Sequence, residues 1–147
     1  MQSPYDDILM EHIKNARNYR VLDGPSESAS GANALCGDAM TVFVRMEDGR
    51  IEEVAFQCEC CGVSMASASI MTEMVVGASA EQARARLKSF LARVADRGDT
   101  GRDVENPAQS AVVAVVRQYP VRSRCAMLPW LTLEAALDGR SEPIYVR

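Results

Sequence analysis

Three cysteines fall within four residues, at Cys58, Cys60 and Cys61, and they are the side chains of this chain best suited to chemistry. They stand where a predicted strand gives way to a predicted helix of small side chains. Thiols gathered at the end of an element are better placed to hold a metal or to pass sulfur than to fill a core. The other two cysteines, Cys36 and Cys125, are distant in sequence, so whether they lie near this group depends on the fold.

The number and context of the cysteines favour metal binding or catalysis over disulfide bonding. Five is an odd number, so a fully paired disulfide framework is excluded. Asp6, Asp7 and Glu11 come early in the chain, unlike a signal peptide, so we expect a cytoplasmic protein with reduced thiols. The single histidine, His12, excludes a site with two imidazoles, and we interpret it as a packing residue of the first helix.

Length and composition predict one soluble domain over residues 1–147. The net charge of -4 argues against nucleic acid as the main partner, because phosphate binding requires a basic surface. A local basic patch could still form from Arg117, Arg122 and Arg124. No apolar run approaches the roughly 20 residues of a membrane span, so we expect no membrane association.

A predicted hairpin connects the first cysteine to the central group. Residues 40–46 and 50–57 have strand character, and the Asp48-Gly49 dipeptide between them is a strong hairpin signal. In an antiparallel hairpin, the segment before the first strand lies beside the segment after the second. We therefore expect Cys36 and Asp38 to lie near residues 58–61.

Cys36 and Asp38 are two residues apart, which places both side chains on one face of an extended segment. A thiolate and a carboxylate on one face can form the edge of a metal site. A turn with an Asx-type cap explains the same pair, and the residues leave both interpretations open.

The rest of the chain is predicted to be mainly helical. Helices are expected within residues 4–19 and over 62–77, 79–96, 107–117 and 126–137, with residues 22–34 as an irregular loop and a frayed tail after Gly139. Cys61 would stand at the start of one helix and Cys125 just before another, with Arg122 and Arg124 close by. A helix N-terminus and nearby arginines both favour a thiolate.

Three sequence blocks resemble the U-type iron–sulfur cluster assembly scaffolds, the family that includes IscU, SufU and the N-terminal domain of NifU. They are Asn33-Ala-Leu-Cys-Gly-Asp38, Cys60-Cys-Gly-Val-Ser-Met-Ala-Ser-Ala-Ser-Ile-Met-Thr72 and Pro120-Val-Arg-Ser-Arg-Cys-Ala126. They occur in the family's order and cover most of the chain. The one change in the first block is Ala34, where proline is usual.

The resemblance implies both a fold and a set of ligands. The fold would be α+β, with a three-stranded antiparallel sheet, about five helices mainly on one side, and the metal or cluster site at exposed loop tips. The third strand would have to come from the region before Cys36. By position in the motifs, the family's ligands correspond to Cys36, Asp38, Cys61 and Cys125.

Two departures from the family pattern make this chain similar to the SufU branch, whose members bind zinc and accept sulfur from a cysteine desulfurase. Arg124 stands where most scaffolds have histidine, and Tyr119-Pro-Val-Arg-Ser123 replaces their chaperone-recognition motif. Cys58 and Cys60 are a third departure, because glycines are usual at these positions. We interpret them as incidental, one facing the core and the other the solvent, with a resolving thiol or an extra ligand as the alternative.

The resemblance implies an iron–sulfur scaffold that accepts sulfur from a cysteine desulfurase, assembles a labile 2Fe-2S cluster or its precursor, and passes it to acceptor apo-proteins. Cys125 is the predicted sulfur acceptor, and Arg122 or Arg124 would contact the partner or a transient persulfide. A zinc-bound sulfurtransferase of the SufU type is the first alternative, with Zn²⁺ at the same site. A structural zinc module without sulfur transfer is the second. We expect a monomer or a weak dimer.

Overall fold

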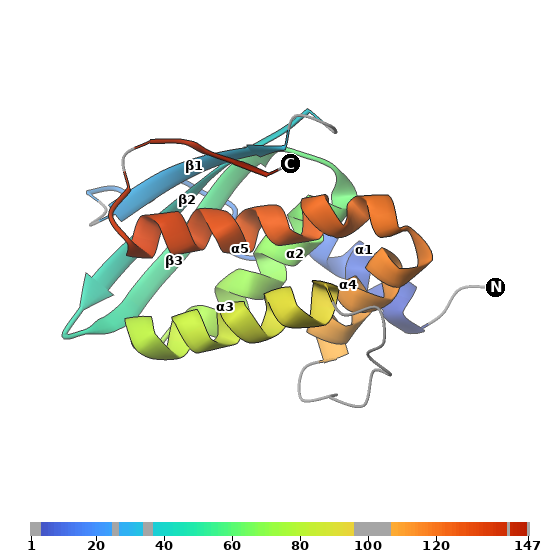
Figure 1. The fold of residues 1–147 in the computed structure, drawn as a ribbon. Helices are drawn as coiled ribbons and strands as arrows, with labels where there is room; N and C mark the ends of the chain where they lie inside the picture. Colours follow the sequence, from blue (N-terminus) through green and yellow to red (C-terminus); the bar gives the residue numbers. More distant parts are fainter. Residues whose placement is uncertain (1–3, 25–26, 34–36, 96–106, 141, 147) are drawn as a thin grey trace.

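The computed structural model describes residues 4–24, 27–33, 37–95, 107–140 and 142–146 (Figure 1). Its elements in chain order are α1 (Pro4–Lys14), β1 (Glu27–Asn33), β2 (Asp38–Glu47), β3 (Arg50–Glu59), α2 (Gly62–Val75), α3 (Ala80–Ala95), α4 (Pro107–Gln118), the 3₁₀ turn η1 (Pro120–Arg122), α5 (Ser123–Leu137) and β4 (Ile144–Val146). The α+β class and the predicted helices are confirmed.

The sheet has four strands in the order β3-β2-β1-β4, and it is mixed. The pairs β1–β2 and β2–β3 are antiparallel, whereas β4 runs parallel to β1. The expectation of three antiparallel strands is therefore corrected. The added strand is the C-terminal segment, which was predicted to be a frayed tail and instead pairs with residues 31–33 of β1.

The region before Cys36 supplies β1, the strand that the family resemblance required and that the residue pattern did not reveal. Its sequence consists mostly of small residues, because α5 crosses it closely. At Gly31, an added Cβ would collide with the Thr132 hydroxyl oxygen and press on Leu128 and Ile144. Small side chains on this strand therefore reflect close packing rather than a loop.

The β2–β3 hairpin matches its prediction. Asp48 and Gly49 both have positive φ, 53° and 77°, as a two-residue hairpin turn requires. Along β2, Met40, Val42 and Val44 are buried and alternate with more exposed residues. One face of the sheet is therefore covered, and the register places the beginning of β2 beside the end of β3.

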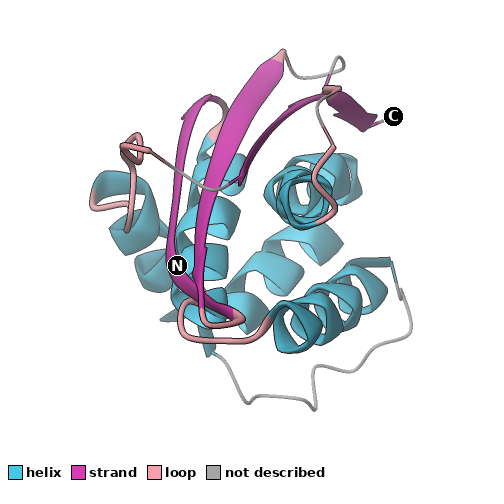
Figure 2. Ribbon diagram, turned by 90° about the vertical axis from the view of Figure 1, so that its left-hand side faces the viewer, coloured by secondary structure: helices cyan, strands magenta, loops and turns pink. Residues whose placement is uncertain are grey.

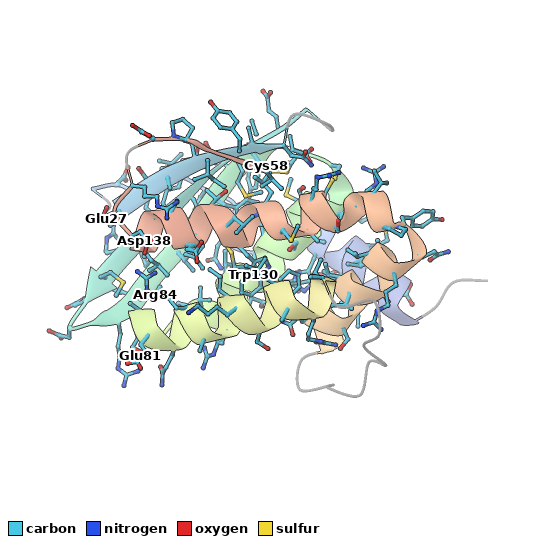
Figure 3. All side chains as sticks on the ribbon, in the orientation of Figure 1. Glu27, Cys58, Glu81, Arg84, Trp130 and Asp138 are labelled. Carbon is cyan, nitrogen blue, oxygen red and sulfur yellow. A yellow bond between two sulfur atoms is a disulfide. The ribbon has the colours of Figure 1, made fainter. Side chains whose placement is uncertain are left out.

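The helices supply the covering layer (Figure 2). Helix α5 packs on β1 and β2, and α2 packs between α5 and β3. Trp130 of α5 stacks on Phe90 of α3, with ring centroids 4.7 Å apart, in the interior between these helices (Figure 3). A capping box opens α3, since the Ser79 hydroxyl accepts the Gln82 N–H while the Ser79 N–H donates to the Gln82 side chain. Within the described residues, no helix combines the length and the apolar character needed to cross a bilayer.

Helix α5 begins at Ser123, three residues before the predicted start at 126, and Pro129 therefore lies in the interior of the helix. A proline lacks the N–H that would bond the carbonyl four residues before it, here the carbonyl of Cys125. Ser64 of α2 supplies the missing donor, with its hydroxyl 2.9 Å from that carbonyl oxygen. The small, hydroxyl-bearing helix α2 thus stabilises the part of α5 that carries Cys125.

Candidate metal centre

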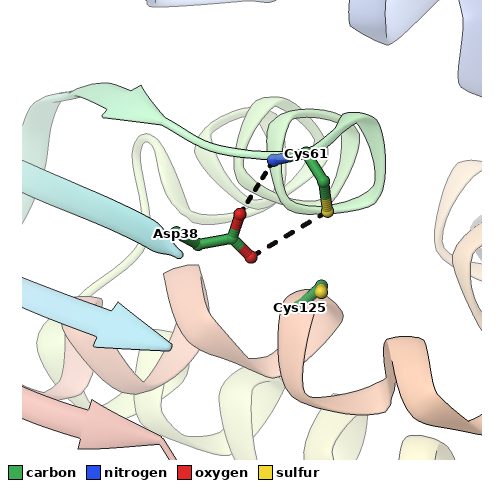
Figure 4. A group of neighbouring side chains, drawn as sticks. All are labelled: Asp38, Cys61 and Cys125. Carbon is green, nitrogen blue, oxygen red and sulfur yellow. Dashed lines mark hydrogen bonds between the residues drawn. The ribbon is translucent and has the colours of Figure 1, made fainter. Parts of the chain in front are cut away.

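Asp38, Cys61 and Cys125 converge from three elements (Figure 4). Asp38 is the first residue of β2, Cys61 immediately precedes α2, and Cys125 is the third residue of α5. One ligand atom from each lies within 4.8 Å of the other two. The structure thus brings together three residues of the predicted ligand set.

The hairpin and the start of α2 fix the geometry between Asp38 and Cys61. One Asp38 carboxylate oxygen accepts the backbone N–H of Cys61 at 3.0 Å, and the other lies 3.9 Å from the Cys61 sulfur. Gly37, with φ of 70°, adopts the left-handed conformation that lets the chain turn into β2 at this point. Cys61 is extended and stands immediately before the first residue of α2.

Cys125 has no exposed surface. The side-chain amide of Asn33, also fully buried, lies 3.7 Å from the Cys125 sulfur and donates a hydrogen bond to it. An N–H donor stabilises negative charge on sulfur in a buried place. Asn33 is paired with Asp38 across β1 and β2, so one pair of strand ends supports both of these ligands.

Ser64 of α2 contacts all three of these residues. Its hydroxyl lies 3.2 Å from an Asp38 oxygen, 3.7 Å from the Cys61 sulfur and 2.9 Å from the Cys125 carbonyl oxygen. A hydroxyl has one proton to donate, so Ser64 donates to the Cys125 carbonyl, the nearer of the two oxygens, and its own oxygen can accept from the Cys61 thiol. Neither Ser64 nor Asn33 was predicted to be a site residue. The available signal was their position within the two blocks that carry Asp38 and Cys61.

The described part of the site is less exposed than loop tips would be. Asp38 is 3% exposed and Cys125 is fully buried, because the strand end and the first turns of α5 pack against each other. Cys61 alone of the three is half-buried, and it lines an open hollow together with Val115, Tyr119 and Arg122. Access to the centre therefore runs past Cys61.

The other predicted site residues fall in different places. Cys36 lies outside the described residues. Arg122 reaches the hollow beside Cys61, whereas no described hydrogen bond or ion pair links Arg124 to the centre. His12 is buried and bonded to Ser69, 2.7 Å away, which agrees with its interpretation as a packing residue.

Cys58 and Cys60 were predicted to be reduced and to face opposite ways, and this is corrected. The structure joins them in a disulfide, and both are half-buried against the edge of the core. Alternation along a strand places neighbours, not residues two apart, on opposite faces, so it gives no reason for Cys58 and Cys60 to point in opposite directions.

The donor set fits a metal. Zinc is bound tetrahedrally by thiolates about 2.3 Å away and carboxylate oxygens about 2.1 Å away, so ligands around one ion lie within roughly 4 Å of each other. The three atoms here are gathered within 4.8 Å. Thiolates are also the usual ligands of iron–sulfur clusters. Two thiols and a carboxylate can therefore hold either, together with a further ligand.

Comparison with known proteins agrees with the resemblance. The iron–sulfur cluster assembly scaffold protein IscU of Streptococcus pyogenes serotype M1 is 33% identical over 138 residues, covering 90% of this chain and 82% of the relative. The zinc-dependent sulfurtransferase SufU of Bacillus subtilis (strain 168) is 32% identical, covering 88% and 86%.

A solved structure has the same fold. It is described as an iron–sulfur cluster assembly scaffold for the SUF system from Fervidobacterium islandicum AW-1, and it matches with a TM-score of 0.79 at 26% identity over 92% of this chain and 96% of that one. Residues 4–126 match the family described as the NifU-like N terminal domain. Because this match spans most of the chain and all three sequence blocks, the protein belongs to the NifU-like N-terminal domain family.

Proposed function

We propose that the protein is an iron–sulfur cluster assembly scaffold that accepts sulfur from a cysteine desulfurase and passes a labile cluster to acceptor apo-proteins. The observation that carries the proposal is the convergence of Asp38, Cys61 and Cys125 within 4.8 Å. Cys36 is the proposed fourth ligand. Clusters that are stored are usually held by four thiolates, so three thiolates and a harder carboxylate oxygen suit a cluster that must be released.

A zinc-dependent sulfurtransferase is the second candidate function. The three described ligand atoms gather around one point, as they would around a single tetrahedral ion. Arg124 in place of the histidine of most scaffolds points the same way, as does the 32% identity to the Bacillus subtilis sulfurtransferase. In this alternative, Asp38, Cys61 and Cys125 hold Zn²⁺, and a ligand cysteine takes up sulfur.

The residue that first meets the sulfur donor is proposed to be Cys61. A persulfide forms when a thiolate attacks a donor sulfur, so the acceptor must be reachable. Cys61 is half-buried beside an open hollow, whereas Cys125 is fully buried. Cys125 stays a prediction as a sulfur acceptor, in a second position behind Cys61. Arg122, on the same hollow, is placed to contact a partner or a transient persulfide anion.

The test is metal and sulfide analysis of the protein purified without oxygen, before and after incubation with a cysteine desulfurase, cysteine and ferrous iron. Iron and acid-labile sulfide bound in equal amounts support the scaffold. Bound zinc without sulfide, together with faster desulfurase turnover, supports the sulfurtransferase. Protein that binds neither metal and leaves the desulfurase unaffected contradicts both.

Matched serine variants locate the function. Cys61→Ser should abolish persulfide formation and lower the metal content, while Cys125→Ser should lower the metal content and leave persulfide on Cys61. The double variant Cys58→Ser with Cys60→Ser is the control, because neither residue belongs to the proposed ligand set, and the zinc that it binds in the absence of a sulfur donor should equal that of the unmodified protein.

A further inference from the structure

The disulfide between Cys58 and Cys60 closes the end of β3, and Cys61 follows it directly in the chain. Neither cysteine is among the described residues that converge on the metal centre. Two thiols that can pair reversibly are a two-electron redox group. Their place beside a sulfur-carrying site raises the question of what they reduce.

The strand register places this pair next to the metal centre. Cys58 stands directly opposite Met40 in the β2–β3 pairing. Asp38 precedes Met40 by two residues on β2, so Asp38, Met40 and Cys58 belong to one face of the sheet, and Cys60 lies just past Glu59, the last residue of β3. The Asp38 carboxylate on that face contacts both the backbone N–H and the sulfur of Cys61. The Cys58–Cys60 pair therefore borders the residue at which sulfur is proposed to enter.

The pair is also accessible from outside. Both cysteines are half-buried, and Cys58 lines an open hollow at the edge of the sheet with Tyr19, Gln57 and Glu59. The Tyr19 hydroxyl donates to the Cys58 carbonyl at 2.9 Å and holds the end of β3 in place. An external dithiol can thus approach the disulfide from this hollow, away from the one beside Cys61.

We propose that Cys58 and Cys60, in their reduced form, are a built-in reductant that converts a persulfide on Cys61 into sulfide and thiol. The inference rests on the proposed function, because sulfur acceptance supplies the persulfide. A persulfide's outer sulfur needs two electrons to become the sulfide found in iron–sulfur clusters, and a dithiol gives up two electrons when it closes to a disulfide. The disulfide in the structure is the oxidised product of this step.

The step balances in two exchanges. The Cys60 thiolate attacks the outer sulfur of the Cys61 persulfide, forming a bond between Cys60 and that sulfur while the bond to Cys61 breaks and leaves the Cys61 thiolate. The Cys58 thiolate then attacks the Cys60 sulfur, forming the Cys58–Cys60 disulfide and expelling the outer sulfur as hydrosulfide. Two thiol sulfurs are oxidised and the transferred sulfur is reduced by two electrons. An external dithiol restores the pair by ordinary thiol–disulfide exchange.

The experiment uses the full chain, reduced and then desalted without oxygen so that no reductant remains. It is loaded with sulfur in two parallel arms, one with cysteine desulfurase and cysteine, the other with a low-molecular-weight persulfide. Released sulfide is measured, and the peptide containing residues 58–61 is weighed by mass spectrometry. We expect sulfide release in proportion to the Cys58–Cys60 disulfide formed.

Single variants show which cysteine carries the transferred sulfur at each exchange. Cys60→Ser should keep the extra sulfur on Cys61, and Cys58→Ser should pass it to Cys60 and keep it there. Both should lose sulfide release, and added dithiothreitol should restore it in each. Unmodified protein with the disulfide already closed should also retain the persulfide, which controls for any effect of the substitutions on folding.

The outcomes separate the two proposals. Persulfide on Cys61 with sulfide release that is equally fast in the Cys58→Ser, Cys60→Ser double variant overturns the inference and leaves the proposed function standing. Loading by the small persulfide but not by the desulfurase counts against the proposed function, while the release measurement still decides the inference. Failure to load Cys61 in either arm contradicts both.

Discussion

Ser69 of α2 is one of the residues that hold the N-terminal segment to the rest of the protein. Its hydroxyl oxygen accepts the backbone N–H of Arg17 at 2.8 Å and lies 2.7 Å from the Nδ1 atom of His12. If the hydroxyl donates its proton to Nδ1, the imidazole is neutral, with its proton on Nε2, which lies 3.7 Å from Glu73. Burial lowers the pKa of His12 below 6.5, and the positive charge of Arg17 lowers it further, against the opposing effects of Glu73 and Glu11.

This arrangement predicts a pH dependence of stability. The folded state holds His12 with a lowered pKa, so between that pKa and 6.5 the unfolded chain binds more protons. The contribution of His12 is therefore present in full above pH 6.5 and is lost as the pH falls through the folded-state pKa. His12→Asn keeps a hydrogen-bonding group near Nδ1 but does not titrate. We expect its urea midpoint to fall less between pH 6.5 and about pH 5 than that of the unmodified protein. If the urea midpoints of the two proteins fall equally over this pH range, His12 is not the group responsible for the pH dependence.

At the scale of elements, the interface between α2 and α5 determines where Cys125 stands. Pro129 deprives the Cys125 carbonyl of its helical donor, and the Ser64 hydroxyl replaces it. One turn further along α2, Ser67 donates to the Ala126 carbonyl at 2.7 Å and accepts the Trp130 indole N–H at 3.1 Å. The Ser64 hydroxyl and Pro129 are thus expected to be energetically coupled, because the hydroxyl replaces the donor that the proline lacks.

A double-mutant cycle tests this coupling. Ser64→Ala should lower the free energy of unfolding by about 1–3 kcal/mol, because it leaves the buried Cys125 carbonyl without that donor. In a Pro129→Ala background, the restored N–H can serve that carbonyl, so the additional cost of Ser64→Ala should shrink by about 1 kcal/mol. Ser67→Ala is the matched control, since residue 130 already has its N–H and no such coupling to position 129 is expected. If the losses of unfolding free energy for Ser64→Ala and Pro129→Ala, measured by urea unfolding, simply add in the double variant, the two residues are not coupled.

The sequence predicted the features that depend on neighbouring residues and missed those that depend on contacts between segments distant in the chain. The β2–β3 hairpin was predicted because alternation and the Asp48-Gly49 turn are local signals, and its register alone brought Asp38 to Cys61. Strand β1 was predicted to be a loop because its residues are small. They are small because α5, about 100 positions away in the chain, packs closely on them, as Thr132 does on Gly31. The interior position of Pro129 was missed for the same reason, since its compensation comes from Ser64.

At the scale of the whole molecule, the hydrophobic core does not depend on the metal centre. The buried cluster includes residues of all four strands and five helices, among them the stacked Phe90 and Trp130, each no more than 1% exposed. A chain of 147 residues is long enough to bury most of its surface without a metal to complete the core. The centre lies at one end of this core, where β2, α2 and α5 meet.

Removing the metal with a chelator should therefore leave the protein folded. Trp130 is the only tryptophan, so its near-ultraviolet circular dichroism reports on core packing, and we expect that signal to persist at 25 °C after chelation. The melting temperature should fall, because a ligand of the native state stabilises it by mass action, but the transition should stay cooperative. Cys61→Ser, which weakens the centre, should respond less to the chelator. A protein that loses the Trp130 signal on chelation would be a structural zinc module, because in such a module metal binding supplies the folding free energy that the core here provides.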